Sequence, residues 1–364
     1  MCKKRRILYI VEAMGGGVFT YLVDLSNQLS RNDEIFIAYA VRPQTPSNFK
    51  EYFRKDIHLI EVEGFIRSVN PAKDVKAFLN IRKIAKEVKP DIIHLHSSKA
   101  GFLGRWAFNG NRIPLFYTPH GYSFLMLNQS ALKRSIYKAL ENICGKRPCI
   151  TISCSEGEHQ ESIKINSGAV YVNNGVNITE LNRLMNSLKK PAPHPFTVFT
   201  LGRICDQKNP KLFNQIALAM PDVNFLWIGD GELRNLLNAP NIQITGWVKR
   251  AEALEYSLQA DVFILTSLWE GLPISLLEAM CMKKVCVVSD VIGNHDVIHH
   301  QVNGFVCQET EDFVSAIQQC RNPEIVETLT NYAYEEILQE YNTDVMAKKY
   351  SEIYQKALNQ AKRG

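Results

Sequence analysis

Two glutamates, Glu270 and Glu278, stand eight residues apart, just after the apolar run Val262-Phe263-Ile264-Leu265. We expect this run to form a buried strand, with Glu270 in the loop at its carboxyl end. Pro273 is suited to the first turn of a helix, where its missing N–H costs nothing. The helix then places Glu278 about one and a half turns from its start. Two carboxylates held in this way offer hydrogen-bond acceptors to hydroxyl groups.

Backbone donors should lie between these two carboxylates. The N–H groups of Gly271, Leu272 and Ile274 fall at the predicted helix N-terminus, where they have no intrahelical partner and favour anions and hydroxyl oxygens. Acceptors at both ends and donors in the middle suit a sugar linked to a nucleotide. Two solvated surface carboxylates would be the better reading of an arbitrary pair, but the sequence Glu-Gly-Leu-Pro followed by Leu-Glu-Ala-Met is far more specific.

Two cations occupy a second loop, Leu201–Pro210, which follows another apolar run. Arg203 can bind a diphosphate through two parallel hydrogen bonds, and Lys208 can bind it as a point charge. Both would stabilise the negative charge that develops on a departing nucleoside diphosphate. The alternative is a solvated loop with a helix start. We therefore predict that Arg203 and Lys208 take part both in binding and in catalysis.

A third loop, Met14-Gly15-Gly16-Gly17, follows the first predicted strand and opens a helix. Gly16 and Gly17 allow the backbone to approach a phosphate closely. A dinucleotide site needs a further glycine where Thr20 stands, and an acidic residue at the end of the second strand, which instead runs into Arg42. A dehydrogenase is therefore disfavoured, whereas a tight turn without function remains the alternative.

Three histidines lie at two further strand ends. His120 stands beside Gly121 after the strand Leu115–Thr118, where it should face the ligand. His94 alternates with apolar neighbours and is expected to be buried. His96 either faces the ligand or caps a helix.

The composition is that of a globular protein, with 46% hydrophobic and 22% charged residues. Its 364 residues suggest two domains. The basic start is followed by an apolar run too short for a signal peptide, and no segment is long enough to span a membrane, so we expect a cytoplasmic protein. The nine cysteines form no C-x-x-C pair and should be reduced thiols. A net charge of +5 without aromatic interleaving argues against nucleic acid.

Short apolar runs alternate with helical patterns along the whole chain, which predicts parallel sheets covered by helices on both faces. Three prolines within residues 189–195 indicate a linker. We therefore predict an α/β protein with two Rossmann-like, doubly wound domains facing a cleft. The predicted parts are an N-terminal domain over residues 1–180, a linker over 181–195, a C-terminal domain over 196–343 and a final helix over 344–364.

The glutamate segment resembles the E-x7-E signature of retaining glycosyltransferases of the GT-B fold, in particular glycosyltransferase family 4. Further segments along the chain are similar to that family, including Gly-Arg…Gln-Lys-Asn in the cationic loop and Thr-Pro-His-Gly-Tyr. The resemblance implies an acceptor-binding first domain, a second domain that binds a nucleotide sugar, and a final helix that crosses back to the first domain. It also implies transfer of a sugar to an acceptor hydroxyl with retention of configuration.

The resemblance implies roles for individual residues. Glu278 would hold the ribose hydroxyls, Glu270 the donor sugar and Val248 the base, while His120 orients the sugar and supports the reaction. The leaving phosphate would take the acceptor's proton. The expected site comprises catalytic His120, Glu270, Arg203 and Lys208; donor-binding Gly16, Gly17, Arg203, Lys208, Val248, Glu270, Gly271, Leu272, Ile274 and Glu278; and acceptor-side His96, Ser97 and Tyr122.

No metal is expected, because no DxD-type pair stands at a strand end and the cationic loop can neutralise the diphosphate. No cofactor is expected either, since the nucleotide sugar, most simply a UDP-sugar, is the donor substrate. A sugar-nucleotide 2-epimerase is a rival that the glutamate segment disfavours. A non-catalytic nucleotide-sugar-binding subunit is another, which the four intact residues Arg203, Lys208, Glu270 and Glu278 disfavour.

The segments around His96 and His120 look most like enzymes of bacterial capsule, exopolysaccharide or O-antigen assembly, whose acceptors are lipid-linked sugars. The helix expected over Ala131–Ile143 mixes apolar and basic residues. It either rests on the anionic inner face of the plasma membrane or packs as an ordinary surface helix. Peripheral membrane association is thus one expectation for localisation.

Overall fold

A computed structural model describes residues 4–12, 14–42, 45–66, 68–188 and 193–361. The chain divides into two compact units. Unit 1 comprises Met1–Leu125, Gln129–Asn174 and Thr343–Gly364, and unit 2 comprises Met126–Asn128 and Gly175–Asn342. The division after Asn174 precedes the boundary expected at residue 180. The expected linker is partly a helix of unit 2, α6 (Ile178–Ser187), and its residues 189–192 lie outside the described ranges.

Unit 1 is built on a seven-stranded parallel sheet with the order β3-β2-β1-β4-β5-β6-β7. Its strands are β1 (Arg6–Val11), β2 (Glu34–Tyr39), β3 (His58–Glu61), β4 (Ile92–His96), β5 (Leu115–Thr118), β6 (Ile150–Ser153) and β7 (Val170–Tyr171). Strands β1 and β4 lie in the middle of the sheet and are buried almost throughout, because helices cover both of their faces; β1 is mainly apolar, whereas β4 carries His94 and His96. The expectation of a parallel, doubly covered sheet is confirmed.

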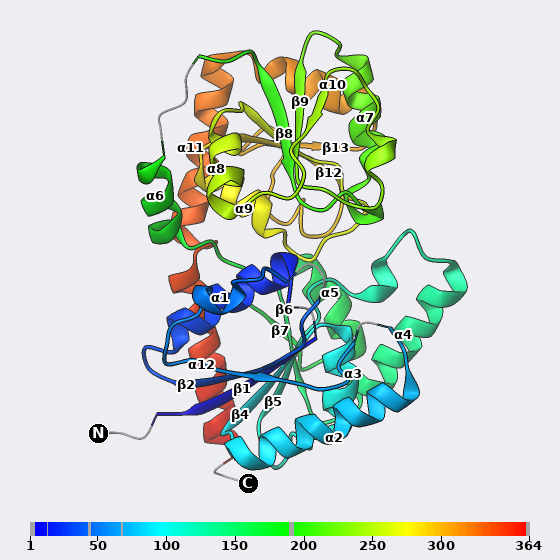
Figure 1. The fold of residues 1–364 in the computed structure, drawn as a ribbon, viewed down its shortest axis with the longest axis vertical. Helices are drawn as coiled ribbons and strands as arrows, with labels where there is room; N and C mark the ends of the chain where they lie inside the picture. The colour runs from blue at the N-terminus through cyan, green and yellow to red at the C-terminus, as the bar shows by residue number, and fades with distance from the viewer. Residues whose placement is uncertain (1–3, 13, 43–44, 67, 189–192, 362–364) are drawn as a thin grey trace. The chain divides into compact units, whose positions relative to one another are not determined.

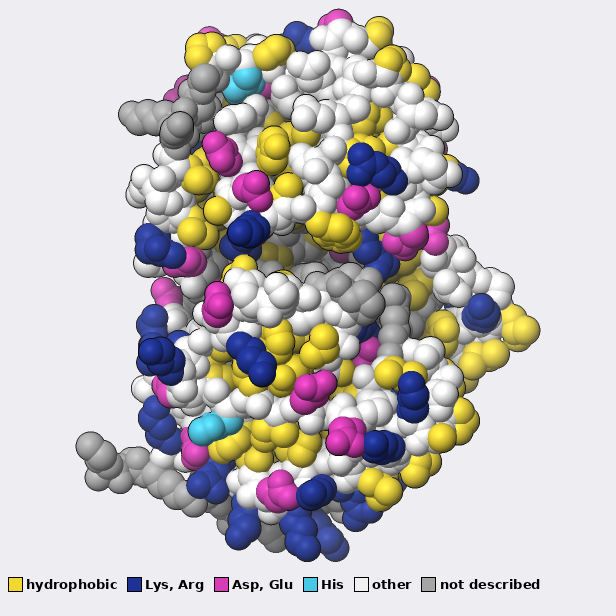
Figure 2. Space-filling view, viewed as in Figure 1, with side chains coloured by type: hydrophobic (Ala, Val, Ile, Leu, Met, Phe, Trp, Pro, Cys, Tyr) yellow, Lys and Arg dark blue, Asp and Glu magenta, His cyan; other side chains and the backbone are white. Residues whose placement is uncertain are grey.

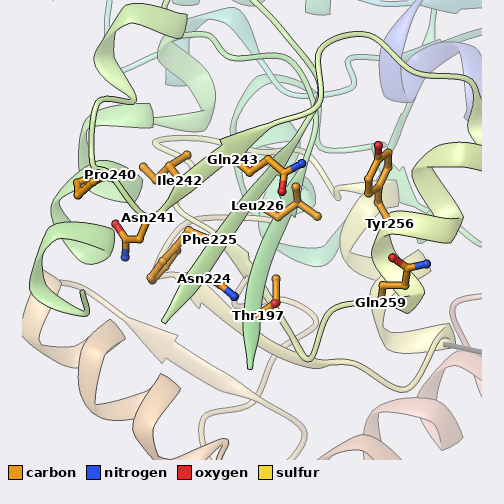
Figure 3. A pocket seen from close by; sticks show the side chains of 10 residues that line it. All are labelled: Thr197, Asn224, Phe225, Leu226, Pro240, Asn241, Ile242, Gln243, Tyr256 and Gln259. Atoms are coloured by element: carbon orange, nitrogen blue, oxygen red, sulfur yellow. The ribbon is translucent and has the colours of Figure 1, made fainter. Parts of the chain in front are cut away.

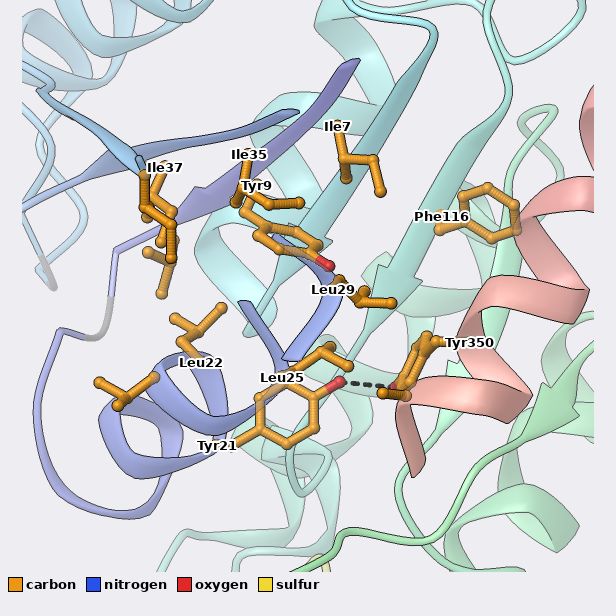
Figure 4. Close-up of a cluster of buried hydrophobic side chains, with 14 of the residues drawn as sticks. Ile7, Tyr9, Tyr21, Leu22, Leu25, Leu29, Ile35, Ile37, Phe116 and Tyr350 are labelled. Carbon is orange, nitrogen blue, oxygen red and sulfur yellow. Dashed lines mark hydrogen bonds between the residues drawn. The ribbon is translucent and has the colours of Figure 1, made fainter. Parts of the chain in front are cut away.

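Six helices complete unit 1 in its described residues (Figure 1): α1 (Gly16–Leu29), α2 (Pro71–Val88), α3 (Ser98–Ala107), α4 (Ala131–Gly145), α5 (Glu156–Ile165) and α12 (Thr343–Ala361). Successive side chains of a strand point to opposite faces. Ile7 and Tyr9 of β1 therefore pack with α1 and α12, whereas Leu8 and Ile10 pack with α2 and α3. Figure 4 shows the first of these two cores, with Tyr9 and Tyr21 at its centre.

Unit 2 repeats this design with a six-stranded parallel sheet in the order β10-β9-β8-β11-β12-β13. Its strands are β8 (Thr197–Leu201), β9 (Asn224–Ile228), β10 (Ile242–Ile244), β11 (Val262–Leu265), β12 (Val285–Ser289) and β13 (Phe305–Cys307). Besides α6, its helices are α7 (Pro210–Ala219), α8 (Arg250–Leu258), α9 (Ile274–Cys281), α10 (Thr310–Gln319) and α11 (Pro323–Gln339). The two parallel, doubly wound α/β domains expected from the sequence are confirmed. No helix in the described ranges has the length and apolarity to cross a membrane.

Four elements escaped the sequence analysis: α5, α6, β13 and α11. Helix α5 carries mostly polar residues and offers little apolar periodicity. Strand β13 has three residues, too few to show a pattern. Helix α11 does carry a readable start, because the Asn322 side chain accepts a hydrogen bond from the Glu324 N–H and Pro323 occupies the first turn.

The last helix, α12, packs onto unit 1 through two buried tyrosines. Tyr21 Oη donates to Tyr350 Oη at 2.6 Å, as the dashed line in Figure 4 marks. Tyr354 Oη lies 2.6 Å from Nδ1 of His94 on β4, and its ring meets Phe116 of β5. Both tyrosines are fully buried. Polar contacts inside an apolar interface therefore select the register in which α12 docks.

We expect Tyr354→Phe to lower the free energy of unfolding by about 1–3 kcal/mol, because it leaves Nδ1 of buried His94 without its hydroxyl partner. Glu352→Ala, on the exposed side of the same helix, should change it by less than about 0.5 kcal/mol. Urea denaturation of the full chain measures both. Equal effects of the two substitutions would contradict this account of how α12 docks.

Candidate active site

The cationic loop and the glutamate loop of unit 2 are bonded to each other. They follow the adjacent strands β8 and β11, whose carboxyl ends lie at the same edge of the sheet. Leu268 N–H donates to the Gln207 carbonyl at 2.8 Å, and Thr266 Oγ1 donates to the Lys208 carbonyl at 2.7 Å. Ligands of open α/β sheets bind beyond this edge. The two predicted motifs therefore form one surface.

Glu270 is the centre of that surface. Its Oε1 lies 2.7 Å from Lys208 Nζ and accepts from Ser267 Oγ at 2.7 Å, and its Oε2 accepts from Gln207 Nε2 at 3.1 Å. The side chain is only 7% exposed. A buried carboxylate is retained only when it is paired and hydrogen-bonded, and Glu270 is both. The sequence identified Glu270 and Lys208 but not Ser267 or Gln207, which hold the carboxylate in place.

Close packing brings another backbone segment against the glutamate loop. Gly293 has φ +84°, and a Cβ added there would lie 2.3 Å from the Gly271 carbonyl oxygen. Only glycine fits both the left-handed backbone and the narrow gap. The loop that carries Glu270 and Gly271 is thus supported from the β12 side as well as from the Lys208 side.

Glu278 has a partner that the sequence did not indicate. Its Oε1 accepts from Arg250 Nη2 at 2.6 Å, and the carboxylate is 9% exposed while the guanidinium is 32% exposed. Arg250 is the first residue of α8, two positions after the predicted base neighbour Val248. The pair joins α8 to α9. Arg250 holds one carboxylate oxygen of Glu278 and so limits how that side chain can be presented to a ligand.

Arg203 is held far less firmly than Lys208. Its Nη2 lies 3.5 Å from Glu232 Oε1, and its side chain is 31% exposed. Behind it, Gly229 has φ +138°, and a Cβ there would lie 2.2 Å from the Gly202 carbonyl oxygen. The backbone under Arg203 is therefore rigid, whereas its guanidinium keeps donors that face solvent. This arrangement suits an anion that arrives from outside.

Two of the three backbone donors predicted at the start of helix α9 are those of Gly271 and Ile274. Pro273 occupies the position just before its first residue, not the first turn that the sequence suggested. Within the described ranges, the N–H groups of Gly271 and Ile274 bond to no other residue. Leu272 and Ile274 are buried, so their side chains shape the wall while backbone groups supply the polarity. An anion or hydroxyl oxygen is the natural partner of such donors.

Two cavities in unit 2 lie at opposite edges of its sheet, and one of them adjoins these loops. One, of about 220 Å³, lies at the carboxyl edge and is lined in part by Asn209, Thr266, Ser267 and Ser289. The other, of about 490 Å³, lies at the amino ends of β8, β9 and β10, as Figure 3 shows with Thr197 and Asn224 at its wall. The larger cavity is thus at the opposite edge of the sheet from the predicted chemistry, and the smaller one adjoins it.

The glycine loop of unit 1 is open. Gly16 begins α1 with φ +58°, which favours glycine, and no atom of the described residues lies within 4 Å of a Cβ placed on Gly16 or Gly17. The helix has no side-chain cap and no acidic residue in its first turn. A helix N-terminus of this kind favours an anion such as a phosphate.

His120 has an unusual backbone, since it adopts φ +56° and Gly121 follows with φ +90°. The turn is held by Glu158 of α5, whose Oε1 accepts from Gly121 N–H at 2.6 Å and whose Oε2 accepts from Cys154 N–H at 2.8 Å. Glu158 is fully buried. Strained backbone of this kind persists where surrounding contacts over-determine it, and it is concentrated at functional sites.

The three histidines form one cluster on the α12 face of the sheet. His94 Nε2 lies 2.9 Å from Thr118 Oγ1, and His96 Nδ1 lies 3.1 Å from His120 Nε2. Burial lowers the pKa of His120 to about 3 and holds the pKa of His94 and His96 well below the usual value, with the other histidines adding to the effect. All three rings are therefore neutral at physiological pH.

Two of the three acceptor-side predictions need correction. His96 is fully buried, and Tyr122 is 1% exposed, with its hydroxyl 2.8 Å from Ser162 Oγ and its ring stacked on Phe124. Neither side chain has surface left for an acceptor. Ser97 is partly exposed and has φ +71°. The error arose because His96 ends β4 and Tyr122 lies in the loop after β5, and at such places a polar side chain can turn inward as easily as outward.

Helix α4 carries an apolar row that faces solvent instead of a core. Leu132, Ile136, Leu140 and Ile143 are 73%, 49%, 40% and 52% exposed. Figure 2 shows hydrophobic side chains next to basic ones over this part of the surface. The helix is attached through Glu141, which is buried against the rest of unit 1. An ordinary amphipathic surface helix would turn this row inward.

The chain matches two family descriptions that together cover most of its length. Residues 15–180 match "Glycosyltransferase Family 4", and residues 195–322 match "Glycosyl transferases group 1". Both cationic and glutamate loops fall within the second match, and His120 falls within the first.

Two curated relatives span most of this chain. An Escherichia coli protein named UDP-Gal:alpha-D-GlcNAc-diphosphoundecaprenol alpha-1,3-galactosyltransferase is 28% identical and covers 84% of this chain and 85% of its own. A Campylobacter jejuni protein named N,N'-diacetylbacillosaminyl-diphospho-undecaprenol alpha-1,3-N-acetylgalactosaminyltransferase is 24% identical and covers 94% of this chain and 97% of its own.

Solved structures share the fold at low identity. The sucrose-phosphate synthase of Thermosynechococcus elongatus superimposes with a TM-score of 0.80 at 15% identity, covering 98% of this chain and 100% of its own. An Anabaena protein in complex with UDP and glucose superimposes with a TM-score of 0.74 at 16% identity, covering 97% of this chain and 100% of its own.

The histidine cluster predicts a loss of stability in acid. Burial lowers the pKa of His120 to about 3 and the pKa of His94 and His96 well below the usual 6.5, so below pH 6.5 the unfolded chain binds protons that the folded chain does not. The free energy of unfolding therefore falls as pH falls. Each such histidine contributes about 1.4 kcal/mol per pH unit. We expect His120→Asn to reduce the slope measured by urea denaturation between pH 7 and pH 5. Identical slopes in the wild type and His120→Asn would contradict the neutral cluster.

Proposed function

We propose that this chain, which belongs to the family 4 (group 1) glycosyltransferases, moves a sugar from a nucleotide sugar to a hydroxyl of a lipid-linked glycan, with retention of configuration. The observation that carries the proposal is the bonded pair of loops in unit 2. It presents a buried, oriented carboxylate at Glu270 beside a partly exposed guanidinium at Arg203. The carboxylate suits the hydroxyls of a sugar, and the guanidinium suits the diphosphate attached to that sugar.

In the proposed donor complex Arg203 binds the diphosphate, with Lys208 adding positive charge while it orients Glu270. Glu270 and the N–H groups of Gly271, Leu272 and Ile274 bind the sugar. Glu278 binds the ribose hydroxyls, and Val248 lies against the base. Gly16 and Gly17 of unit 1 approach the diphosphate, and His120 orients the sugar. A UDP-sugar is the proposed donor, since the E. coli relative is named for UDP-Gal.

The chemistry needs one bond made and one broken. The acceptor oxygen bonds to the anomeric carbon of the sugar while the bond from that carbon to the diphosphate oxygen breaks. The leaving phosphate oxygen takes the proton of the acceptor hydroxyl on the same face, which retains configuration. Charge develops on the diphosphate, and the guanidinium of Arg203 is the group that stabilises it. Because this cation is part of the protein, we propose that turnover needs no metal ion.

The acceptor is proposed to be a sugar on a polyprenyl diphosphate used for capsule, exopolysaccharide or O-antigen assembly. Both relatives described above are named for undecaprenol-linked acceptors. A further relative, 27% identical over 82% of this chain and 85% of its own, is an uncharacterised Klebsiella pneumoniae protein of a cps region. A lipid-linked substrate requires the enzyme to work at a membrane surface, and the exposed apolar row of α4 provides a means of reaching one.

A 2-epimerase and a non-catalytic binding subunit are the rival functions. Neither is favoured, because the E. coli and C. jejuni relatives described above are named as transferases and the loop pair is intact. The rivals differ in their products. An epimerase releases a free sugar or its epimer without an acceptor, whereas a binding subunit releases no nucleoside diphosphate at all.

We expect Arg203→Ala to lower kcat/KM by at least about tenfold, because the leaving diphosphate loses its exposed cation. The fold should be preserved, since Arg203 has a single long ion pair. The assay follows release of UDP from UDP-galactose with a GlcNAc-diphosphopolyprenol acceptor, with and without EDTA. Arg321→Ala is the matched control, because Arg321 pairs with Asp222 at the amino edge of the sheet. An unchanged kcat/KM in Arg203→Ala would remove Arg203 from the site.

The exposed row of α4 predicts binding to anionic vesicles. Replacing Leu132 and Ile136 by serine should weaken co-sedimentation with phosphatidylglycerol vesicles about tenfold or more, since burying one such side chain is worth roughly 1.5 kcal/mol. Leu79→Ser on α2, a leucine of similar exposure, is the control and should have no effect. If co-sedimentation depended neither on the anionic lipid nor on the α4 substitutions, this surface would be excluded as a membrane-binding site.

A further inference from the structure

His96 is a fully buried histidine without an evident structural need. It lies two residues after His94 on β4, so both rings point to the α12 face of the sheet. The ring of His96 is enclosed by those of Tyr9, Tyr21 and His94, with centroids 5.2, 5.7 and 4.1 Å away. An apolar residue of the same size would fill this place at lower cost, because burying polar groups is unfavourable.

The hydrogen bonds of His94 and His96 differ. His94 has a hydroxyl at each ring nitrogen, Tyr354 Oη and Thr118 Oγ1, so either of its tautomers is satisfied. His96 has one partner, His120 Nε2, 3.1 Å from its Nδ1. Its Nε2 is buried and has no partner among the described residues. The bond to His120 is therefore the one polar interaction that His96 makes with its side chain.

Proton counting restricts the tautomers of the pair. Both rings are neutral, because burial lowers both pKa values far below neutrality. One proton must then lie between His96 Nδ1 and His120 Nε2. If His120 supplies it, His96 carries its own proton on the orphaned Nε2, and buried N–H groups without acceptors are rare. If His96 supplies it, only a lone pair is orphaned, and His120 carries its proton on Nδ1.

The outward side of His120 is open to a ligand. His120 is partly exposed, and its Nδ1 has no partner within the described part of the chain. Glu158 holds the Gly121 N–H behind it, and the edge of Tyr21 meets its ring at 4.6 Å. The ring is thus fixed by His96 on one nitrogen and by packing on its side, and it presents the other nitrogen outward.

We propose that His96 is a positioning residue that holds His120 in the Nδ1-protonated tautomer, so that His120 acts as a neutral hydrogen-bond donor. Resting on the proposed function, we assign the acceptor of that bond as an oxygen of the donor sugar. His120 then orients the sugar without exchanging a proton during transfer. A substitution of His96 that keeps a hydrogen-bond donor at the position of the His96 Nδ1 must preserve the tautomer of His120. Asparagine is such a replacement, because its side-chain nitrogen can occupy that place, whereas phenylalanine has no donor.

The first test reads the tautomer without substrate. Two-bond ¹H–¹⁵N correlation spectra of the ¹⁵N-histidine-labelled full chain at pH 7 distinguish Nδ1–H from Nε2–H imidazoles, and the spectrum of His120→Asn identifies the His120 signal. We expect His120 in the Nδ1–H form in the wild type and in His96→Asn, and a change toward Nε2–H in His96→Phe. An Nε2–H signal for His120 in the wild type would overturn the proposal, whether or not the protein is a transferase.

The second test separates positioning from general stability. We expect His96→Phe to lower kcat with UDP-galactose and to weaken its binding about tenfold, while binding of UDP, which lacks the sugar, stays within about twofold. His96→Asn should restore most of both losses. Failure of UDP itself to bind the wild type would count against the proposed donor and leave the tautomer result standing. If His96→Phe weakened the binding of UDP and of UDP-galactose equally, or if His96→Asn restored neither kcat nor binding, His96 would be only a core residue.

Discussion

The ion pair between Lys208 and Glu270 is the interaction on which the proposed donor site depends. It joins the loops after β8 and β11, which are adjacent in the sheet but distant in sequence, and it is buried. Since a buried carboxylate without its cation is destabilising by several kcal/mol, the two loops can form only together. Gln207 and Ser267 then fix the orientation of Glu270. The consequence is a carboxylate presented at one angle before any ligand arrives, with Arg203 left free enough to meet an anion.

In the described residues of unit 1, the His120 ring is held without an ion pair. His120 is held by a buried carboxylate acting on the neighbouring backbone, Glu158, and by a neutral ring, His96. Burial removes the option of a charged imidazole, so the site gains a donor of fixed direction instead of an acid or base. Tyr350 and Tyr354 close the cluster from α12, which couples the docking of the last helix to the environment of the histidines. Stability and site geometry in unit 1 therefore share one set of contacts.

Much of this was predictable from the sequence, for identifiable reasons. Buried strands such as β8 and β11 are apolar runs between loops, and Lys208 and Glu270 stand in the loops that follow these two strands, where parallel sheets bind ligands. The partners were not predictable. Arg250 is an ordinary helix-start arginine in sequence, and only the packing of α8 on α9 places it at Glu278. Glu158 was hidden because α5 is too polar to show a helical period. His96 was ambiguous because alternation along a strand gives the face of a side chain but not what covers it.

A thermal-shift screen against UDP, GDP, dTDP and ADP sugars, without metal and with Arg203→Ala beside the wild type, tests the central claim most directly. A ligand near one hundred times its Kd should stabilise the fold by about 2.7 kcal/mol. The account predicts a clear rise in Tm with one nucleotide class for the wild type and a much smaller rise for Arg203→Ala. No rise with any of the four, with or without Mg²⁺, or the same rise in both proteins, would contradict the assignment of the paired loops as the donor site.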